Sequence, residues 1–357
     1  MTALSVNYLG ADTAPTLRVQ RLAYLRFERP DIQKAERFLN DFGLITLHKS
    51  TTDIYLAANT KADWCYHLKQ ASTPRFVGIG FDASSRSDLE RLARTLGTDG
   101  PESIDEHGAV ERVITHDPNG FTVEVNVRDQ VTPLESHASA TAVNTSINAT
   151  RINEIQDCPA SPPEIIKLGH IVIETPGYES TVRWYQRHLG LIPSDTQVLD
   201  SGEPVVTFFR MNLGDTPTDH HTLAIAHTFQ SAFSHAAFEV NDIDAIGAGQ
   251  QHMRNQGWSH AWGIGRHRLG SQLFDYWSDP WGAHHEHYSD GDVFTEEHPL
   301  GVSNASAQAM SQWGQIMPAK FIRPKINLAT LITLFRNIRK HPDLTLKKLA
   351  AIAKVMT

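Results

Sequence analysis

Hydrophobic and polar residues alternate in several short segments of the chain, and a helical pattern follows each of them. Residues 22–31 (LAYLRFERPD) and residues 168–177 (LGHIVIETPG) have the period of a strand and end near a proline. After the second segment, Val182, Tyr185 and Leu189 recur at helical spacing. The pattern therefore predicts a strand followed by a helix in two well-separated parts of the chain.

The same order of elements recurs later in both parts. Residues 76–97 and 233–257 each have the pattern of a strand, a polar turn and a helix. Residues 117–125 (DPNGFTVEV) and 279–287 (DPWGAHHEH) each have a D-P-x-G turn that leads into a strand. We expect four strand–helix–strands units, two in each half, and therefore an α+β protein in which curved mixed sheets partly enclose a site.

A segment without a sustained period separates the halves. Residues 131–163 are rich in Ser, Thr, Ala and Asn and end in prolines, which is typical of a linker. We therefore predict an N-terminal domain over 1–130, a C-terminal domain over 164–298 and a tail over 299–357. The tail contains two amphipathic patterns separated by Pro342, over 326–340 and 344–356.

The tail differs from the remainder in charge. From Lys320 onward it has nine Lys or Arg residues and one acid, Asp343, so its formal charge is +8 in a chain of −8. The remainder must carry −16. This complementarity favours packing of the tail on the same chain or on a neighbouring subunit, and we expect a homo-oligomer. An anionic membrane or the mouth of the active site are the alternative partners of the tail.

Composition excludes several other classes. The net charge of −8 argues against a nucleic-acid role. The two cysteines, Cys65 and Cys158, are too few for a disulfide framework or a thiolate metal site. The chain begins without the pattern of a signal peptide, and it has no uninterrupted apolar stretch long enough to span a membrane. We therefore expect a cytoplasmic protein.

Two histidines and one glutamate stand out in the second half. His170, His235 and Glu286 each lie in a segment of period two, and His170 shares a strand face with Val172 as His235 does with Ala237. Two imidazoles and one carboxylate can hold a mononuclear iron(II) and leave coordination positions open. Both oxygens of a catechol and O₂ can use such open positions together.

Residues 265–286 (GRHRLGSQLFDYWSDPWGAHHE) resemble the signature of the extradiol ring-cleavage dioxygenases of the vicinal oxygen chelate superfamily. The residues that match in order and spacing are His267, Tyr276, Asp279, Pro280, Gly282 and Glu286. The resemblance covers 164–292 well and 20–130 weakly. It implies a two-domain vicinal oxygen chelate fold, with two βαβββ modules per domain forming a partly closed curved sheet, followed here by a helical tail.

The resemblance also implies roles for individual residues. His170, His235 and Glu286 would bind iron(II), for which manganese(II) could substitute. Tyr276 would donate a hydrogen bond to a substrate hydroxyl, and His267 would line the pocket near the same group.

An acid–base histidine is implied at His221, a residue type that titrates near neutrality. The adjacent His220 is its rival for that role. The chain departs from the family pattern at Gly270, where some members have an acid or amide, and at Asp275, where an apolar residue is usual. Both positions are expected around the substrate pocket.

The strand that contains Glu286 has a histidine on each side. Since strand side chains alternate, His284 is expected to share the face of Glu286 and to lie by the pocket. His285 and His287 are expected to point away from it.

The first half lacks the histidine ligands. Aligning the halves places Tyr24 at the position of His170 and Gly78 at that of His235, while Glu124 matches Glu286. One carboxylate alone will not hold iron(II) at useful affinity. We therefore expect the first half to bind no metal.

The predicted function is extradiol cleavage of a catechol by O₂ in the catabolism of aromatic compounds. The alternatives are a metal-dependent isomerase or lyase of the glyoxalase type, a non-catalytic protein that binds an aromatic ligand, and a hydroquinone-cleaving oxygenase.

Overall fold

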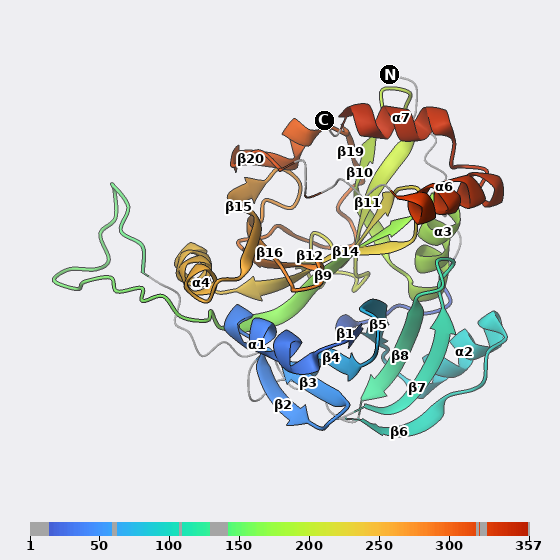
Figure 1. Cartoon of the computed structure of the whole chain (residues 1–357), viewed down its shortest axis with the longest axis horizontal. Coiled ribbons are helices and arrows are strands. Elements are labelled where there is room, and N and C mark those ends of the chain that lie inside the picture. Colours follow the sequence, from blue (N-terminus) through green and yellow to red (C-terminus); the bar gives the residue numbers. More distant parts are fainter. Residues whose placement is uncertain are drawn as a thin grey trace.

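The computed structural model of the chain describes residues 14–58, 63–106, 109–128, 142–318, 321 and 327–355. Residues 131–141, the first part of the predicted linker, lie outside these ranges, as do residues 1–13. Each half contains its own large mixed sheet, coloured blue to cyan in the first half and green to orange in the second (Figure 1). The predicted α+β class is confirmed.

The first half forms an eight-stranded sheet in the order β2-β3-β4-β1-β5-β8-β7-β6. Its strands are β1 (Arg21–Arg29), β2 (Ile45–Lys49), β3 (Asp53–Ala57), β4 (Trp64–Gln70), β5 (Arg75–Asp82), β6 (Glu102–Glu106), β7 (Ala109–His116) and β8 (Thr122–Arg128). The helices α1 (Ile32–Phe42) and α2 (Arg86–Leu96) follow β1 and β5. Asp31 caps α1 by accepting a hydrogen bond from the Lys34 amide, and Gly43 ends it in the left-handed conformation.

The second half forms a ten-stranded sheet in the order β19-β10-β11-β13-β9-β14-β17-β16-β15-β20. Its strands are β9 (Ile165–Thr175), β10 (Ile192–Val198), β11 (Pro204–Arg210), β13 (Leu223–His227), β14 (Ala232–Val240), β15 (Ser259–His267), β16 (Leu273–Ser278), β17 (His284–Ser289), β19 (Gly301–Asn304) and β20 (Ser311–Gly314). Two short strands, β12 (Thr218–Asp219) and β18 (Val293–Phe294), pair separately. The helices here are α3 (Tyr178–Leu189) and α4 (Ile243–Asn255).

Both sheets consist of two βαβββ modules, as the resemblance implies. The modules are β1-α1-β2-β3-β4, β5-α2-β6-β7-β8, β9-α3-β10-β11-β13 and β14-α4-β15-β16-β17. The first strands of paired modules lie antiparallel, β1 against β5 and β9 against β14. The predicted internal repeat is therefore confirmed.

The halves share one buried hydrophobic core and a buried ion pair. The rings of Phe42 and Phe238, one from each half, meet edge to face at 5.6 Å. The guanidinium of Arg29 in β1 donates to Asp279 at 2.8 Å, in the turn that leads into β17. These contacts fix β14 and the turn before β17 against the first half.

The predicted tail, 299–357, begins with two short strands and ends in helices. β19 pairs with β10, and β20 pairs with β15, so residues 301–314 complete both ends of the second sheet. A short 3-10 helix, Ala307–Met310, joins these strands. Short strands without strong alternation carry little sequence signal. The helices α6 (Leu328–Lys340) and α7 (Leu346–Val355) follow, close to the two predicted amphipathic segments.

The described part of the linker has neither helix nor strand. Residues 142–163, coloured green, extend away from the rest of the molecule before β9 begins (Figure 1). Among the helices of the described residues, none has the length and apolar character needed to cross a membrane.

Candidate metal centre and active site

Three neighbouring strands bring the predicted metal ligands together. His170 lies on β9, His235 on β14 and Glu286 on β17. Ala237 of β14 is paired with His170 on one side and with Glu286 on the other, so its small side chain leaves space between the two. The donor atoms of the three side chains lie within 4.8 Å of one another.

The centre of this cluster is a fully buried carboxylate. Both carboxylate oxygens of Glu286 lack a hydrogen-bond partner, as do the Nδ1 atoms of His170 and His235. Glu286 Oε2 instead lies 3.2 Å from His170 Nε2 and 3.4 Å from His235 Nε2. An unpaired buried charge is costly, whereas two imidazoles and a carboxylate satisfy a divalent metal ion. The residues present therefore fit such an ion.

The protonation states agree with this arrangement. Burial alone would raise the pKa of Glu286, yet the facing imidazoles of His170 and His267 hold that pKa below its usual range. Burial lowers the pKa of His235 to about 3, although the charge of Glu286 opposes the shift. An ionised carboxylate and a neutral imidazole are the forms in which these groups bind a metal.

His221 contacts the ligand cluster, and His220 lies behind it. The His221 and His170 rings lie 4.0 Å apart. His220 Nε2 lies 2.7 Å from Asp195 Oδ2, so this nitrogen donates to the carboxylate, and His220 Nδ1 is then free to accept from His221 Nδ1 at 3.0 Å. This order leaves the lone pair of neutral His221 on Nε2. Burial, followed by the charge of His170, lowers the pKa of His221 well below its usual range.

His267 and Tyr276 form a hydrogen-bonded pair on the opposite side of Glu286. His267 Nδ1 donates to the Met310 carbonyl at 2.9 Å, so Nε2 accepts from the Tyr276 hydroxyl at 2.9 Å. His267 Nε2 also lies 3.4 Å from Glu286 Oε1. Burial, followed by the nearby Glu286 charge, raises the pKa of Tyr276 well above its usual range. The tyrosine therefore remains a hydroxyl donor near neutral pH.

An aromatic wall from the tail covers this side of the site. The Phe321 ring stacks on His284 with centroids 4.4 Å apart and nearly parallel planes. The same ring meets Tyr276 edge to face at 5.1 Å and Trp262 at 5.6 Å. The structure thus places His284 on the site side of β17, as its alternation with His285 predicts.

The other two histidines of β17 point away from the metal ligands. His285 Nε2 lies 3.0 Å from the Tyr66 hydroxyl, and His287 Nε2 donates to the Phe42 carbonyl at 2.7 Å. Both partners belong to the first half. The predicted outward direction of these two residues is therefore confirmed.

The prediction that Asp275 lines the substrate pocket is wrong. Its side chain is fully buried on the other face of β16 from Tyr276, where it accepts hydrogen bonds from Gln250 of α4 at 2.9 Å and from Trp277 at 2.7 Å. His260 Nε2 lies 2.7 Å from the same carboxylate. Adjacent residues of a strand point to opposite faces, and Tyr276 takes the site face.

Gly270 lies behind His220 and not among the ligands. A Cβ at this position would lie 3.1 Å from His220 Nδ1, and the glycine has a φ of +77°. The absence of a side chain therefore leaves room for the hydrogen bond between His220 and His221. Gly270 therefore contributes to the site only by giving space to the His220–His221 pair.

Sequence reasoning missed Asp195 and Phe321. Asp195 lies on β10, beneath Gly301 of the tail strand β19, where a Cβ would collide with the aspartate side chain. Phe321 is distant in sequence from every strand of the site. Neither residue belongs to a motif, and only the pairing of strands far apart in sequence brings them here.

The equivalent place in the first half contains arginines. The register of β1, β5 and β8 matches that of β9, β14 and β17, and it places Tyr24 and Glu124 opposite Gly80. Arg26 and Arg112 each donate to Glu124 at 3.0 Å. A guanidinium pair thus neutralises the carboxylate, and no group of histidines and acids suited to a metal occurs there among the residues described.

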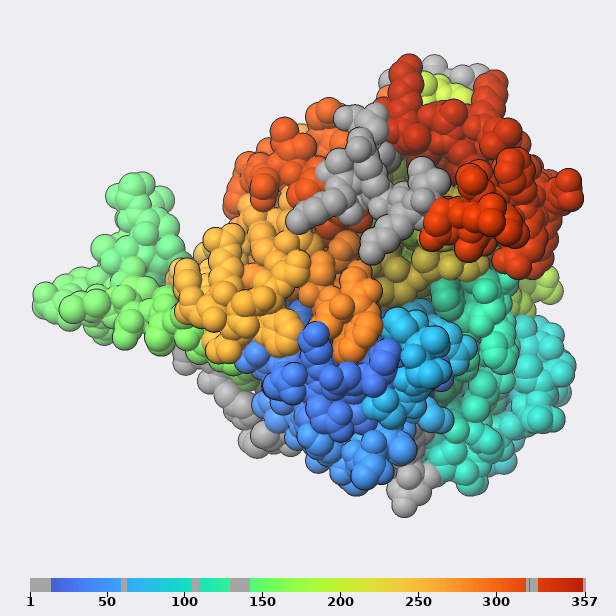
Figure 2. All heavy atoms as spheres, viewed as in Figure 1, coloured from blue at the N-terminus to red at the C-terminus, as the bar shows by residue number. Residues whose placement is uncertain are grey.

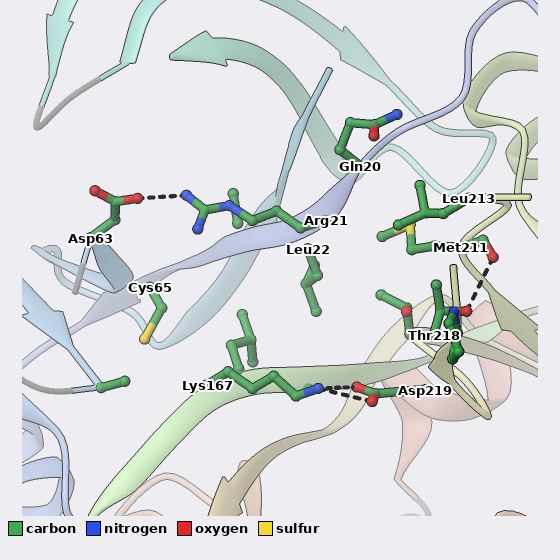
Figure 3. A pocket seen from close by; sticks show the side chains of 16 residues that line it. Gln20, Arg21, Leu22, Asp63, Cys65, Lys167, Met211, Leu213, Thr218 and Asp219 are labelled. Carbon is green, nitrogen blue, oxygen red and sulfur yellow. Dashed lines mark hydrogen bonds and ion pairs between the residues drawn. The ribbon is translucent and has the colours of Figure 1, made fainter. Parts of the chain in front are cut away.

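A separate cleft lies between the halves (Figure 3). Apolar side chains such as Leu22 and Met211 line it together with paired charges. Arg21 donates to Asp63 at 2.6 Å, and Lys167 forms an ion pair with Asp219 at 2.7 Å. None of the predicted site residues borders this cleft. It is therefore distinct from the metal centre.

Comparison with known proteins agrees with the geometry. Residues 167–286 match the Glyoxalase/Bleomycin resistance protein/Dioxygenase superfamily, a range that begins three residues before His170 and ends at Glu286. The segment matched to this superfamily therefore contains all three predicted metal ligands. The tail and the Phe321 wall lie outside the range matched to the superfamily.

The chain is also similar to individual proteins over most of its length. Metapyrocatechase 2 of Cupriavidus necator is 26% identical over 312 residues, which cover 87% of this chain and 93% of the relative. A Mn(II)-bound glyoxalase from Novosphingobium aromaticivorans has a TM-score of 0.70 at 23% identity, covering 87% of this chain and 96% of that one. Homoprotocatechuate 2,3-dioxygenase of Brevibacterium fuscum, in complex with 3,4-dihydroxyphenylacetate, has a TM-score of 0.70 at 18% identity, covering 86% and 92%. Both solved structures share the fold.

Proposed function

We propose that this chain is an extradiol dioxygenase that cleaves a catechol with O₂ at a mononuclear iron(II) held by His170, His235 and Glu286. The observation that carries the proposal is the buried, unpartnered donor cluster with His221 on one side and the His267–Tyr276 pair on the other. The relative from Cupriavidus necator is named a metapyrocatechase, and the Brevibacterium fuscum enzyme binds a substituted catechol.

Iron(II), when bound, would bring the catecholate and O₂ together and relay electrons from the catecholate, which is oxidised, to O₂, which is reduced. The chain contributes the environment. His170 and Glu286 are buried, His235 is half-buried, and the Phe321 wall covers the Tyr276 side, so the access of water to the reacting groups is restricted. By turning its hydroxyl hydrogen bond from His267 Nε2 to one oxygen of the diol, Tyr276 can orient the ring.

His221 is proposed as the acid–base residue in preference to His220. The hydrogen bonds from His221 Nδ1 to His220, and from His220 Nε2 to Asp195, occupy three of the four ring nitrogens of the pair. His221 Nε2 is the remaining one, and it is available to take the proton of a substrate hydroxyl and return it later. Asp195 and His220 then hold the tautomer of His221, and we propose this as their role.

Two observations support a metal-dependent isomerase as the second candidate. The Mn(II)-bound glyoxalase shares the fold, and the same three donors accept manganese. The His267–Tyr276 pair and the neutral His221 would also serve a proton transfer. Oxygen consumption distinguishes the two reactions, because an isomerase consumes none.

The cellular location, the metabolic role and the oligomeric state are also proposals. The free cysteines Cys65 and Cys158 and the absence of a spanning helix among the described residues are compatible with a reducing cytoplasm. We propose aromatic-compound catabolism there, by a homo-oligomer.

The test is anaerobic reconstitution with iron(II) or manganese(II), followed by oxygen uptake on a panel of substituted catechols. We expect one metal ion per chain and one O₂ consumed per catechol opened.

The variant His221→Phe tests the acid–base role. It should bind catechol, yet turn over slower by about a hundredfold or more. The exposed His116 provides the matched control, because His116→Phe should behave like the parent. No oxygen uptake on any catechol, by protein that holds its metal, would reject the proposal.

A further inference from the structure

Helix α6 of the tail has apolar residues on both of its faces. Leu334 and Ile338 are partly buried against the body, and Asn337 between them donates a hydrogen bond to the Phe229 carbonyl at 2.8 Å. The outward face carries Leu328, Leu331, Ile332 and Phe335, with exposures of 73%, 41%, 59% and 58%. An apolar helix face normally packs against another part of a protein. One side of α6 is not covered by any described residue.

Three cations border this apolar stripe. Arg336, Arg339 and Lys340 lie in the last turns of α6, and with Ile332 and Phe335 they line a shallow hollow. None of the three forms an ion pair with another described residue. The adjoining start of α7 adds exposed Leu346 and Lys347. The positive charge of the tail is therefore presented outward beside apolar side chains.

Contacts on the opposite side hold the two helices in place. Asp343, between α6 and α7, accepts a hydrogen bond from the Glu179 amide at the start of α3. Lys348 is buried, and its ammonium lies over the Tyr178 ring at 5.9 Å. Ala351, Ile352 and Val355 of α7 pack on Leu199, Val205 and Ala305. The predicted packing of the tail on its own chain is thus present, but it uses apolar and hydrogen-bonded contacts and leaves the cations of α6 facing out.

We propose that the outward face of α6 seats the protein on an anionic lipid surface. An interfacial helix needs apolar side chains that enter the headgroup region and Lys or Arg residues beside them. α6 has both, and the helix stands at the edge of the molecule (Figure 2). The stripe defined by Leu328, Leu331, Ile332 and Phe335 would insert, and Arg336, Arg339 and Lys340 would contact lipid phosphates.

A second copy of the chain is the competing occupant. A stable dimer buries about 800 Å² on each partner, and a stripe of four side chains on one helix is small beside that requirement. Two such helices packed together would also bring two sets of cations into one interface. Anionic lipid matches both the apolar stripe and the charge, and it needs no large interface.

The experiment is co-sedimentation of the full-length protein with phosphatidylcholine vesicles, with and without phosphatidylglycerol. We expect binding only to the vesicles that contain phosphatidylglycerol, weakened by salt. The triple variant Arg336→Gln/Arg339→Gln/Lys340→Gln should lower the affinity on the order of a hundredfold. The variant Ile332→Ser/Phe335→Ser should also lose binding, and its circular dichroism and unfolding midpoint report whether it folds.

The chain offers a matched control for the apolar variant. Ile147 and Ile155 of the linker are each 95% exposed, a larger fraction than for Ile332 and Phe335, so Ile147→Ser/Ile155→Ser removes exposed apolar side chains from another surface and should bind vesicles like the parent. Binding that needs no anionic lipid, or that survives both α6 variants, would overturn the proposal. So would a dimer, seen by sedimentation, that Ile332→Ser/Phe335→Ser dissociates without any vesicle binding by the parent.

Discussion

The hydroxyl of Tyr24 donates a 2.6 Å hydrogen bond to Glu124, at the place in the first half where the second half has His170 and Glu286. Both halves bury a glutamate at the same register position of the repeat. In the second half two imidazoles face it, which fits a metal ion, and in the first half two guanidiniums neutralise it. Each half of the repeat therefore has a buried carboxylate that requires a compensating positive charge. The arginines supply it in the first half, and a metal ion would supply it in the second.

Metal content should depend on Glu286 and not on Glu124. Glu286→Ala removes the only carboxylate of the donor cluster, so we expect the metal content to fall from about one ion per chain to near zero. Metal analysis after anaerobic loading and desalting measures this.

Glu124→Gln provides the control for that prediction. It should leave the metal content unchanged while it lowers stability, because Arg26 and Arg112 lose a buried charge partner. Two ions per parent chain, or loss of metal from Glu124→Gln, would contradict the assignment of the metal to the second half.

The buried ion pair between the halves should contribute strongly to stability. Arg29 and Asp279 are 3% and 4% exposed, and Asp279 also accepts from the Trp281 and Ala283 amides in its turn. Arg29→Met leaves that carboxylate without its cation, so we expect a loss of about 3 to 5 kcal/mol in the free energy of unfolding, measured with urea.

The exposed pair of Arg75 and Glu28 is the comparison. Arg75 is 61% exposed, so Arg75→Met should cost about 1 kcal/mol or less. Equal losses in the two variants would show that burial does not set the strength of the Arg29–Asp279 pair.

The fold and the cluster of three donor side chains were predictable because they rest on local patterns. The strand alternation around His170, His235 and Glu286 sets which way each side chain points, and the D-P-x-G turns repeat at matching places. The same rule predicts the outward direction of His285 and His287. The prediction for Asp275 is wrong because it rests on family spacing. The alternation of Asp275 with Tyr276 would have placed it correctly on the opposite face of the strand.

The remaining parts depend on pairings between distant segments. β19 brings Gly301 against Asp195, and Phe321 reaches His284 from beyond the second sheet. Neither contact follows from periodicity, since it depends on the path of the tail. The sequence predicts that the basic tail packs on the acidic remainder of the chain. Charge totals do not show which cations face outward, so the outward direction of the α6 cations follows only from the structure.

Phe321 should affect substrate binding more than turnover, a prediction that rests on the proposed function. Its ring stacks on His284 and meets Tyr276, the proposed donor to the diol. Phe321→Ala removes an aromatic wall worth about 1 kcal/mol, so KM for a catechol should rise by about fivefold with kcat changed less. Phe335→Ala, at an outward position of the same tail, should leave KM unchanged. A change in kcat alone would assign Phe321 a different role.

Glu174 should make stability fall as pH rises toward neutrality. Burial raises the pKa of this carboxyl from 4.5 to about 7, opposed only by the hydrogen bond from Thr228. Between these two values the folded protein keeps a proton that the unfolded chain has released, so the stabilisation is complete below about pH 4.5 and is lost as pH rises through about 7.

Glu174→Gln should flatten this slope of the free energy of unfolding against pH. The decrease that it removes amounts to about 1 to 3 kcal/mol and can be measured by urea unfolding across the range. Glu28→Gln is the control: the hydrogen bond from Arg75 lowers the pKa of Glu28, so its contribution is lost only at acidic pH, and the slope near neutrality should remain. A slope that persists in Glu174→Gln would assign the pH dependence to another group.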